Sequence, residues 1–268
     1  MTVTTDTVGF VRRIVAGWTE QTDQHPVYDL LRLLGRWRSH MLANTFISLQ
    51  GGAVIWGGPF AGMNYVRRAT EGALIPRLLG TYESELHPHL AAFAAEGPDC
   101  VIDVGCAEGY YAVGLARMMP GVVIHAHDID EKARIACADL AARNDVADRV
   151  IVGGEFRPQD FEAFAGRRVL VMVDAEGAEL DVLRPDLAPA LAQMSLIVET
   201  HDGYRRDALA TIRARFEPTH DIVQVDTGPK VLDGPPWIRN LPHLDQLLAV
   251  WEWRAFPTPW LVMRPKAG

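Results

Sequence analysis

The chain has 268 residues, enough for one large domain or for one domain with a sizeable extension. Its 49% hydrophobic and 22% charged residues are ordinary for a globular protein, and no apolar run approaches the roughly 20 residues that cross a bilayer. The net charge of −8 argues against a long nucleic acid as partner, because neutralising phosphates usually requires a basic face. The start of the chain lacks the basic-then-apolar order of a secretory signal. We therefore expect a cytoplasmic protein that binds neither membrane nor nucleic acid.

The first part of the chain differs from the rest in its pattern of apolar residues and glycines, and we expect residues 1–95 to form a helical and β-hairpin extension. Apolar residues recur with helical spacing between residues 26 and 37. Residues 45–58, TFISLQGGAVIWGG, are predicted to form two short strands joined at the central Gly-Gly pair. Residues 73–95 are predicted to be helical again. The main domain is then expected to comprise residues 96–268.

From Cys100 onward, short apolar strands alternate with helical segments. The strand candidates CVIDVG, VVIHAHD, RVIVGG, RVLVMVD and SLIVET are rich in β-branched residues and nearly continuously apolar, as buried parallel strands tend to be. HDIVQVD and PWLVMRP are candidates for the last two strands. This alternation of strands and helices predicts an α/β fold with a doubly wound, mostly parallel, seven-stranded, Rossmann-like sheet.

The turn after the first predicted strand has the composition of a cofactor-binding loop. Gly105 permits a positive φ, and Gly109 lets the following helix start close to the strand. Backbone N–H groups and the positive helix end then face a ligand. Asp103 would repel a pyrophosphate, whereas it can attract the amino group on the methionine part of S-adenosylmethionine (SAM). The turn therefore favours SAM over a dinucleotide.

Two later turns complete the expected cofactor site. Asp128 ends the second strand, where a carboxylate can accept hydrogen bonds from ribose hydroxyls. Glu155 and Phe156 follow the third strand, where an adenine is normally flanked in this layout. The predicted cofactor contacts are Asp103, Gly105, Cys106, Ala107, Glu108, Gly109, Asp128, Ile129, Glu155, Phe156 and Asp174.

Four segments together resemble a known family. They are DVGCAEG (103–109), HDIDEKA (127–133), VDAEGAELDVL (173–183) and IVETHD (197–202). In these residues the chain resembles FkbM-type class I SAM-dependent methyltransferases, over about residues 57–265. The resemblance implies a methyltransferase that uses SAM and methylates a sugar or a secondary metabolite. One departure is Ala107, where the usual turn has a glycine, and we expect its φ to stay negative.

Polar residues follow the fourth and fifth predicted strands, whose carboxyl ends should meet at one edge of the sheet. Asp174 and Glu199 end these strands, and Glu176 and His201 follow two residues after them. We predict Asp174, Glu199 and His201 to be catalytic, with His201 as the base that takes the proton of a hydroxyl acceptor. No metal ligand is assigned. As a variant, Mg²⁺ could lie between Asp174, Glu199 and either Asp202 or His201.

The acceptor is expected to be a small molecule, and the extension is expected to cover its side of the site as a lid. Trp56, Phe60, Tyr65 and Tyr82 are candidate walls. The alternatives are N-methylation of a small molecule, a non-catalytic SAM-binding protein, and an NAD-dependent dehydrogenase, against which Asp103 argues. A homodimer is compatible with the sequence.

Overall fold

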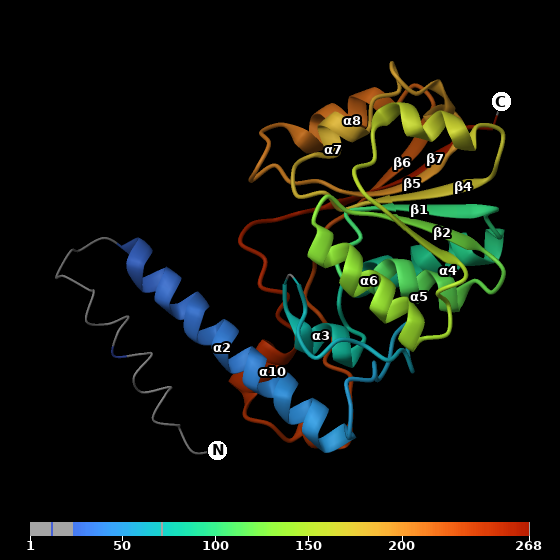
Figure 1. Ribbon diagram of the computed structural model, residues 1–268. Coiled ribbons are helices and arrows are strands. Elements are labelled where there is room, and N and C mark those ends of the chain that lie inside the picture. Colours follow the sequence, from blue (N-terminus) through green and yellow to red (C-terminus); the bar gives the residue numbers. More distant parts are fainter. Residues whose placement is uncertain (1–11, 13–23, 71, 268) are drawn as a thin grey trace.

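A seven-stranded sheet forms the centre of the computed structural model, which describes residues 12, 24–70 and 72–267 (Figure 1). The strand order is β3-β2-β1-β4-β5-β7-β6. The pairs from β3 through β5 are parallel, whereas β7 runs antiparallel to both β5 and β6. The predicted doubly wound, mostly parallel sheet is confirmed. The strands are β1 (Cys100–Val104), β2 (Val123–His127), β3 (Val150–Gly153), β4 (Val169–Val173), β5 (Ser195–Glu199), β6 (His220–Val225) and β7 (Trp260–Pro265).

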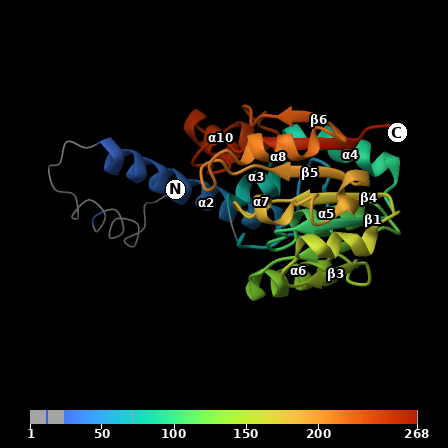
Figure 2. The same ribbon diagram turned by 90° about the horizontal axis from the view of Figure 1, so that it is seen from above.

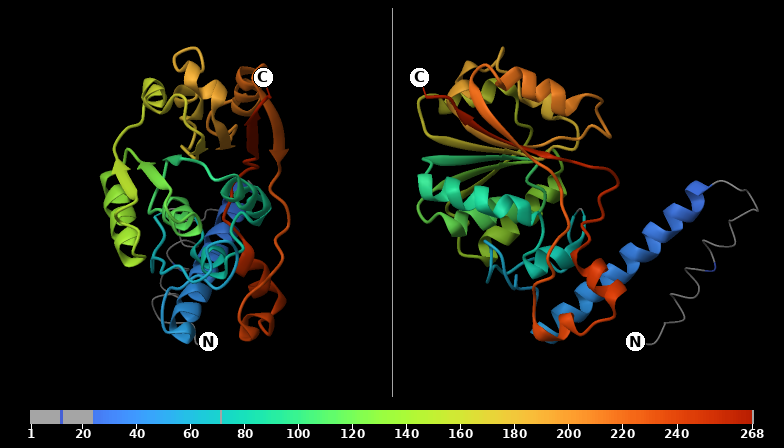
Figure 3. Two further views of the ribbon diagram at one scale, coloured as in Figure 1. Left: turned by 90° about the vertical axis from the view of Figure 1, so that its right-hand side faces the viewer. Right: turned by 180° about the vertical axis from the view of Figure 1, so that it is seen from behind.

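The central strands are apolar on both sides because helices cover both faces of the sheet (Figure 3). Val101 and Leu170 belong to the core on the side of α4, α5 and α6, while their chain neighbours Ile102 and Val171 belong to the core on the side of α7 and α8. This alternation is why the strand segments read as continuous apolar runs. The covering elements are α4 (His87–Glu96), α5 (Tyr110–Met118), α6 (Glu131–Arg143), α7 (Glu179–Val182), α8 (Ala208–Phe216) and the 3₁₀ helices η2 (Pro158–Phe164) and η3 (Pro189–Gln193).

Helices α2 and α3 lie beyond the carboxyl end of the sheet (Figure 1). The long helix α2 projects away from the sheet and packs against α3 and α10 (Figures 1 and 2). Phe46 and Leu78 from these helices share one core with Val101 and Trp260 of the sheet, so the packing is continuous across residue 95. The division into two domains stays a prediction. The elements outside the sheet layers are α2 (Gln24–Gln50), α3 (Leu74–Leu79), η1 (Ser84–Leu86), α9 (Pro236–Arg239) and α10 (His243–Val250).

The predicted β-hairpin at residues 45–58 is wrong in its first strand. Helix α2 continues to Gln50, because Leu42 and Phe46, one helical turn apart, are both buried in the core. Gly51 follows with a φ of +72°, so the glycine ends a helix and does not form a hairpin turn. Pairing does occur further along, as an isolated antiparallel bridge between Val54 and Asn64.

Across the described part of the chain, every helix is too short or too polar to cross a membrane.

The chain turns sharply after β1, and the turn is pressed against the end of β4. Gly105 has a φ of +85°, and a Cβ there would lie 1.7 Å from the backbone oxygen of Asp174. The N–H of Asp174 donates in turn to the carbonyl of Val104, at 3.0 Å. Only a glycine allows this approach, so the segment after β1 and the segment after β4 form one backbone unit.

A substitution pair isolates this contact. Gly105→Ala should lower the free energy of unfolding by about 3 kcal/mol, because it adds a backbone clash to the strain of a positive φ. Gly121→Ala is the matched control: its φ is +91°, but nothing lies within 4 Å of the added methyl. That control should lose only about 1–2 kcal/mol. Urea denaturation of both variants measures the difference, and equal losses would contradict the proposed packing.

Candidate active site

The turn between β1 and α5 is also held by β2 and α6. The N–H groups of Gly105 and Cys106 both donate to the carbonyl of His127, at 2.8 and 3.1 Å. Gly109 precedes α5 with a φ of +94°, and a Cβ there would lie 2.8 Å from the Sγ of Cys137. Gly105 thus allows close packing against the segment after β4, and Gly109 allows it against α6. These contacts fix the backbone of the turn at the carboxyl edge of the sheet.

Ala107 departs from its expected conformation. Its φ is +46° and not negative, so this alanine adopts a backbone region that favours glycine. The N–H of Ala107 donates to Oδ2 of Asp128 at 3.0 Å. A hydrogen bond to a carboxylate contributes about 1.5–3 kcal/mol, which offsets strain of about 1–2 kcal/mol. The turn is therefore tied to the acidic residue that follows β2.

Asp128 is half-buried at the rim of this turn. Its Oδ1 accepts a hydrogen bond from the N–H of Asp130 at 2.8 Å, in addition to the bond at Oδ2. A carboxylate has about four acceptor positions, so two backbone donors leave room for further hydroxyl donors. Ile129, the next residue, is exposed.

Asp103 lies beneath the turn and is only 2% exposed. Its Oδ2 is buried without a hydrogen-bond partner in the described structure. Burial, and next the charge of nearby Asp128, raise the pKa of Asp103 to about 7. A buried carboxyl with an unused oxygen is costly unless a donor or a cation approaches it.

The carboxylate of Glu108, another predicted cofactor contact, already has protein partners. It accepts hydrogen bonds from the hydroxyl of Tyr65 and, at 3.1 Å, from the N–H of Thr70. The guanidinium of Arg77 lies 3.7 Å away. This side chain therefore joins the turn to the N-terminal extension, and only its backbone remains to face a ligand.

The two predicted contacts after β3 lie in different surroundings. Glu155 is exposed and forms an ion pair with Arg157 at 2.8 Å. Phe156 is 6% exposed, and its ring packs edge-on against the rings of His127 and Phe161. Phe156 is thus anchored in the core beside β2, and its role at an adenine stays a prediction.

His201 lies where β4 and β5 end, and the structure brings four carboxylates around it. Its Nδ1 donates to Oε1 of the fully buried Glu179, at 2.7 Å. Its Nε2 faces Oδ1 of Asp174 at 3.6 Å, Oε2 of Glu176 at 3.6 Å and Oε2 of Glu199 at 3.7 Å. The sequence placed three of these groups at the same edge, and the structure adds Glu179 as the partner that orients the ring.

The electrostatics of this cluster favour added positive charge. Burial, followed by the charge of Glu199, raises the pKa of Asp174 well above its ordinary value. Burial also raises the pKa of Glu176. Burial alone would lower the pKa of His201, but the hydrogen bond to Glu179 and the charge of Glu199 outweigh it, and the pKa is raised. The cluster therefore tends to retain protons, or to bind another cation, because its carboxylates repel one another.

Glu199 also has a cationic partner outside the cluster, Arg254, which was not predicted from the sequence. Its Oε1 accepts hydrogen bonds from the guanidinium of Arg254 and from the hydroxyl of Thr258. Burial would raise the pKa of Glu199, but Arg254 and then His201 lower it below its usual value. Glu199 is thus an ionised counterion, and its predicted catalytic role stays a prediction.

Arg254 joins three distant segments at the wall of the site. It pairs with Glu83 before α4 and with Glu252 at 3.0 Å, in addition to Glu199. Arg32 of α2 donates to the carbonyl of Arg254 at 3.0 Å and holds the preceding carbonyl as well. The sequence signal was the aromatic-rich WEWRAF segment, in which an arginine and a glutamate lie among large apolar residues.

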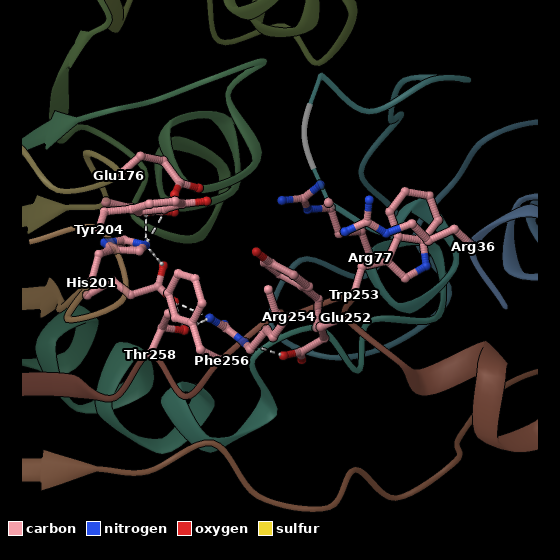
Figure 4. A pocket seen from close by; sticks show the side chains of 15 residues that line it. Arg36, Arg77, Glu176, His201, Tyr204, Glu252, Trp253, Arg254, Phe256 and Thr258 are labelled. Atoms are coloured by element: carbon pink, nitrogen blue, oxygen red, sulfur yellow. Dashed lines mark hydrogen bonds and ion pairs between the residues drawn. The ribbon is translucent and has the colours of Figure 1, made fainter. Parts of the chain in front are cut away.

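A cleft of about 330 Å³ opens over these groups. Glu176, His201 and Tyr204 lie at one end of it, and Arg36, Arg77 and Trp253 lie at the other (Figure 4). Its lining comprises Arg36, Gly72, Arg77, Tyr82, Asp174, Glu176, Glu199, His201, Tyr204, Glu252, Trp253, Arg254, Ala255, Phe256 and Thr258. Residues from the N-terminal extension, the strand ends and the segment before β7 therefore build the cleft jointly.

The Mg²⁺ variant considered from sequence used a different set of residues from the one the structure assembles. Asp202 is exposed, and its carboxylate accepts a hydrogen bond from the N–H of Leu209 at 3.1 Å. Among the residues that the structure describes, the three that could share a metal ion are Asp174, Glu176 and His201, whose ligand atoms lie within 4.8 Å of one another.

No protein-family model and no curated protein matches this sequence. Among solved structures, the chain is similar to the O-methyltransferase from Bacillus cereus in complex with SAH, with 17% identity over 52% of this chain and 71% of that chain and a TM-score of 0.41. It is similar to the O-methyltransferase TomG from Streptomyces achromogenes in complex with SAM, with 16% identity over 53% and 74% and a TM-score of 0.41. A third is precorrin-6y C5,15-methyltransferase from Geobacter metallireducens, with 12% identity over 66% and 86% and a TM-score of 0.41. Similarities at this level assign no function to this chain.

The buried carboxyl of Asp103 makes stability depend on pH. Its folded-state pKa of about 7 exceeds the value of about 3.9 in an unfolded chain, so between these values the folded state keeps a proton that the unfolded state has lost. The free energy of unfolding should therefore fall as pH rises across this interval, by at most about 1.4 kcal/mol per pH unit. Asp103→Asn should flatten that fall in urea denaturation, whereas Asp139→Asn, at an exposed site on α6, should not. Parallel slopes for the wild type and Asp103→Asn would contradict the assignment.

Proposed function

We propose that the protein is a SAM-dependent methyltransferase that methylates a hydroxyl group of a small molecule. The observation that carries the proposal is the backbone contact between the turn after β1 and the segment after β4. A Cβ on Gly105 would lie 1.7 Å from the oxygen of Asp174, and Asp174 also lines the cleft. A cofactor on the turn and an acceptor in the cleft would therefore meet at Asp174, as a direct displacement requires.

The residues of the turn fit SAM in charge and in hydrogen bonding. The unpartnered Oδ2 of Asp103 supplies a carboxylate oxygen for a positively charged amino group. Asp128, half-buried at the rim, retains acceptor capacity for two ribose hydroxyls. A pyrophosphate would be repelled by Asp128 and could not stabilise the ionised form of Asp103, whereas a positively charged amino group would. SAM supplies the transferable methyl on its sulfonium, and the chain positions it.

The cleft supports a small polar acceptor with a ring. Its volume of about 330 Å³ is at the small end of ligand sites, and Tyr204, Trp253 and Phe256 line it with aromatic surface. A hydroxyl group must lose a proton when it is methylated, and the cluster around His201 is the place in the cleft where a proton can be taken up. Together with the resemblance to FkbM-type sequences, this favours a hydroxyl of a sugar or of a secondary metabolite.

Calorimetric titration tests the cofactor. SAM and S-adenosylhomocysteine should bind, and NAD should not. Asp128→Ala should weaken SAM binding by about 1–3 kcal/mol, because hydrogen bonds to a charged group are lost. Asp139→Ala, on the exposed side of α6, should leave the affinity unchanged. Binding of NAD without binding of SAM would overturn the proposal.

The rate of methyl transfer tests the proposed role of the His201 cluster at the acceptor. His201→Ala should lower turnover by about 10²–10⁴-fold, because proton removal at the acceptor oxygen depends on this cluster. SAM affinity should remain nearly intact, since the turn around Gly105 is unchanged. Methyl-labelled SAM supplied with cell extract or a compound panel gives the readout and identifies the product. A wild-type protein that binds SAM but labels no acceptor would instead be a non-catalytic SAM-binding protein.

A further inference from the structure

We propose that Asp174, Glu176 and His201 form a binding site for a divalent first-row transition-metal ion at the acidic end of the cleft. The three residues follow β4 and β5, and Glu176 is half-exposed toward the cleft while His201 is buried beneath it. Figure 4 shows Glu176 and His201 together at one end of the cleft, with Tyr204 beside them. An ion could therefore reach the site from the solvent and still contact a bound acceptor.

The spacing of the candidate ligand atoms suits one shared ion. The Nε2 of His201 lies 3.6 Å from Oδ1 of Asp174 and 3.6 Å from Oε2 of Glu176, and all three ligand atoms lie within 4.8 Å of one another. Ligands about 2.1 Å from an ion are separated from one another by roughly 3.0–3.4 Å. Small side-chain adjustments thus suffice to bring the three atoms onto one ion.

Two of the atoms that face this position are buried and have hydrogen-bonding capacity left. Oδ1 of Asp174 is buried and has no hydrogen-bond partner in the described structure. His201 is 3% exposed, and its Nε2 is too far from the surrounding oxygens for a hydrogen bond. A buried acceptor oxygen and a buried ring nitrogen face each other at 3.6 Å. Each can still bind a ligand, because neither satisfies the other at this distance.

The orientation of the imidazole is fixed from behind. Glu179, with 0% exposure, accepts the proton on Nδ1 at 2.7 Å, and its Oε1 also accepts the N–H of Gly177 at 3.0 Å. In the neutral ring, this fixes the tautomer in which Nε2 carries a lone pair directed at Asp174 and Glu176. A carboxylate that holds the outer nitrogen of a histidine is the usual support of a metal-bound imidazole. Glu179 is therefore a positioning residue in this site.

The donor set selects the class of ion. One imidazole nitrogen and two carboxylate oxygens suit Mn²⁺, Fe²⁺, Co²⁺ or Zn²⁺, whereas Mg²⁺ prefers oxygen ligands alone. Glu199 lies outside the group whose ligand atoms are all within 4.8 Å of one another, and its Oε1 is already held by Arg254 and Thr258. The site thus differs in ligands and in preferred ion from the Mg²⁺ variant considered from the sequence.

The catalytic role of the ion rests on the proposed function, but its binding does not. When bound, such an ion would supply a Lewis acid that polarises the acceptor hydroxyl. His201 would then act as a ligand, and the competing role is that of a free base. The two roles differ in a binding measurement that needs no acceptor and no SAM.

Titration of the full-length, chelator-stripped protein with MnCl₂ and with ZnCl₂ tests the site by calorimetry, and the Mn²⁺ resonance spectrum reports the bound fraction. One ion should bind per chain, more tightly than Mg²⁺ from MgCl₂. Glu176→Gln, at a half-exposed position that leaves the core intact, should weaken binding at least ~10-fold. Glu179→Gln should weaken it by about 10–100-fold without removing a ligand. Asp202→Asn, which keeps a cap for Leu209, should bind like the wild type.

The outcomes separate the metal site from the proposed function. Absence of Mn²⁺ and Zn²⁺ binding, or binding that Glu176→Gln and Glu179→Gln leave unchanged, would overturn the site and assign His201 to proton uptake alone. Metal binding at these residues in a protein that transfers no methyl group would support the site and overturn the methyltransferase. Where both hold, EDTA should abolish methyl transfer, and Mn²⁺ should restore it while SAM affinity remains unchanged.

Discussion

The close approach of two backbone segments at the carboxyl edge of the sheet is the constraint on which the site depends. Gly105 leaves no space for a side chain beside the carbonyl of Asp174, and the N–H of Asp174 bonds back to β1. Strands β1 and β4 are neighbours in the sheet. The contact therefore fixes the position of the segment after β1 relative to the segment after β4. The turn after β1 and the carboxylate that lines the cleft consequently belong to one closely packed unit.

A second constraint is the concentration of buried negative charge over that edge. Glu83, Glu199 and Glu252 surround the single guanidinium of Arg254, which draws the extension, β5 and the segment before β7 together. Removing one partner from such a network leaves buried charges uncompensated, at a cost of about 3–5 kcal/mol. In the cluster around His201, Asp174 and Glu176 form no ion pair with an arginine or lysine among the described residues, which suits them to binding a proton or a metal ion.

The N-terminal extension contributes to the site through backbone contacts as well as through side chains. Arg32 of α2 holds two consecutive carbonyls, those of Trp253 and Arg254, while Trp253 itself has a φ of +67°. A bulky aromatic residue keeps such a conformation only where its surroundings enforce it. The wall of the cleft opposite His201 is therefore shaped by a helix from the other end of the chain.

The sequence by itself determined the sheet, the glycine turn after β1 and the polar strand ends, because each of these features depends on contiguous residues. Apolar runs specify buried strands, and a glycine after a strand specifies a tight turn, whatever lies elsewhere. Contacts between distant segments were decided only by the tertiary structure. Arg254 meets Glu83 across the fold, Glu179 orients His201, and the helical course of residues 45–50 follows from burial of Phe46 against the core. No local pattern encodes such pairs, since each depends on where the packed sheet brings a side chain from another part of the chain.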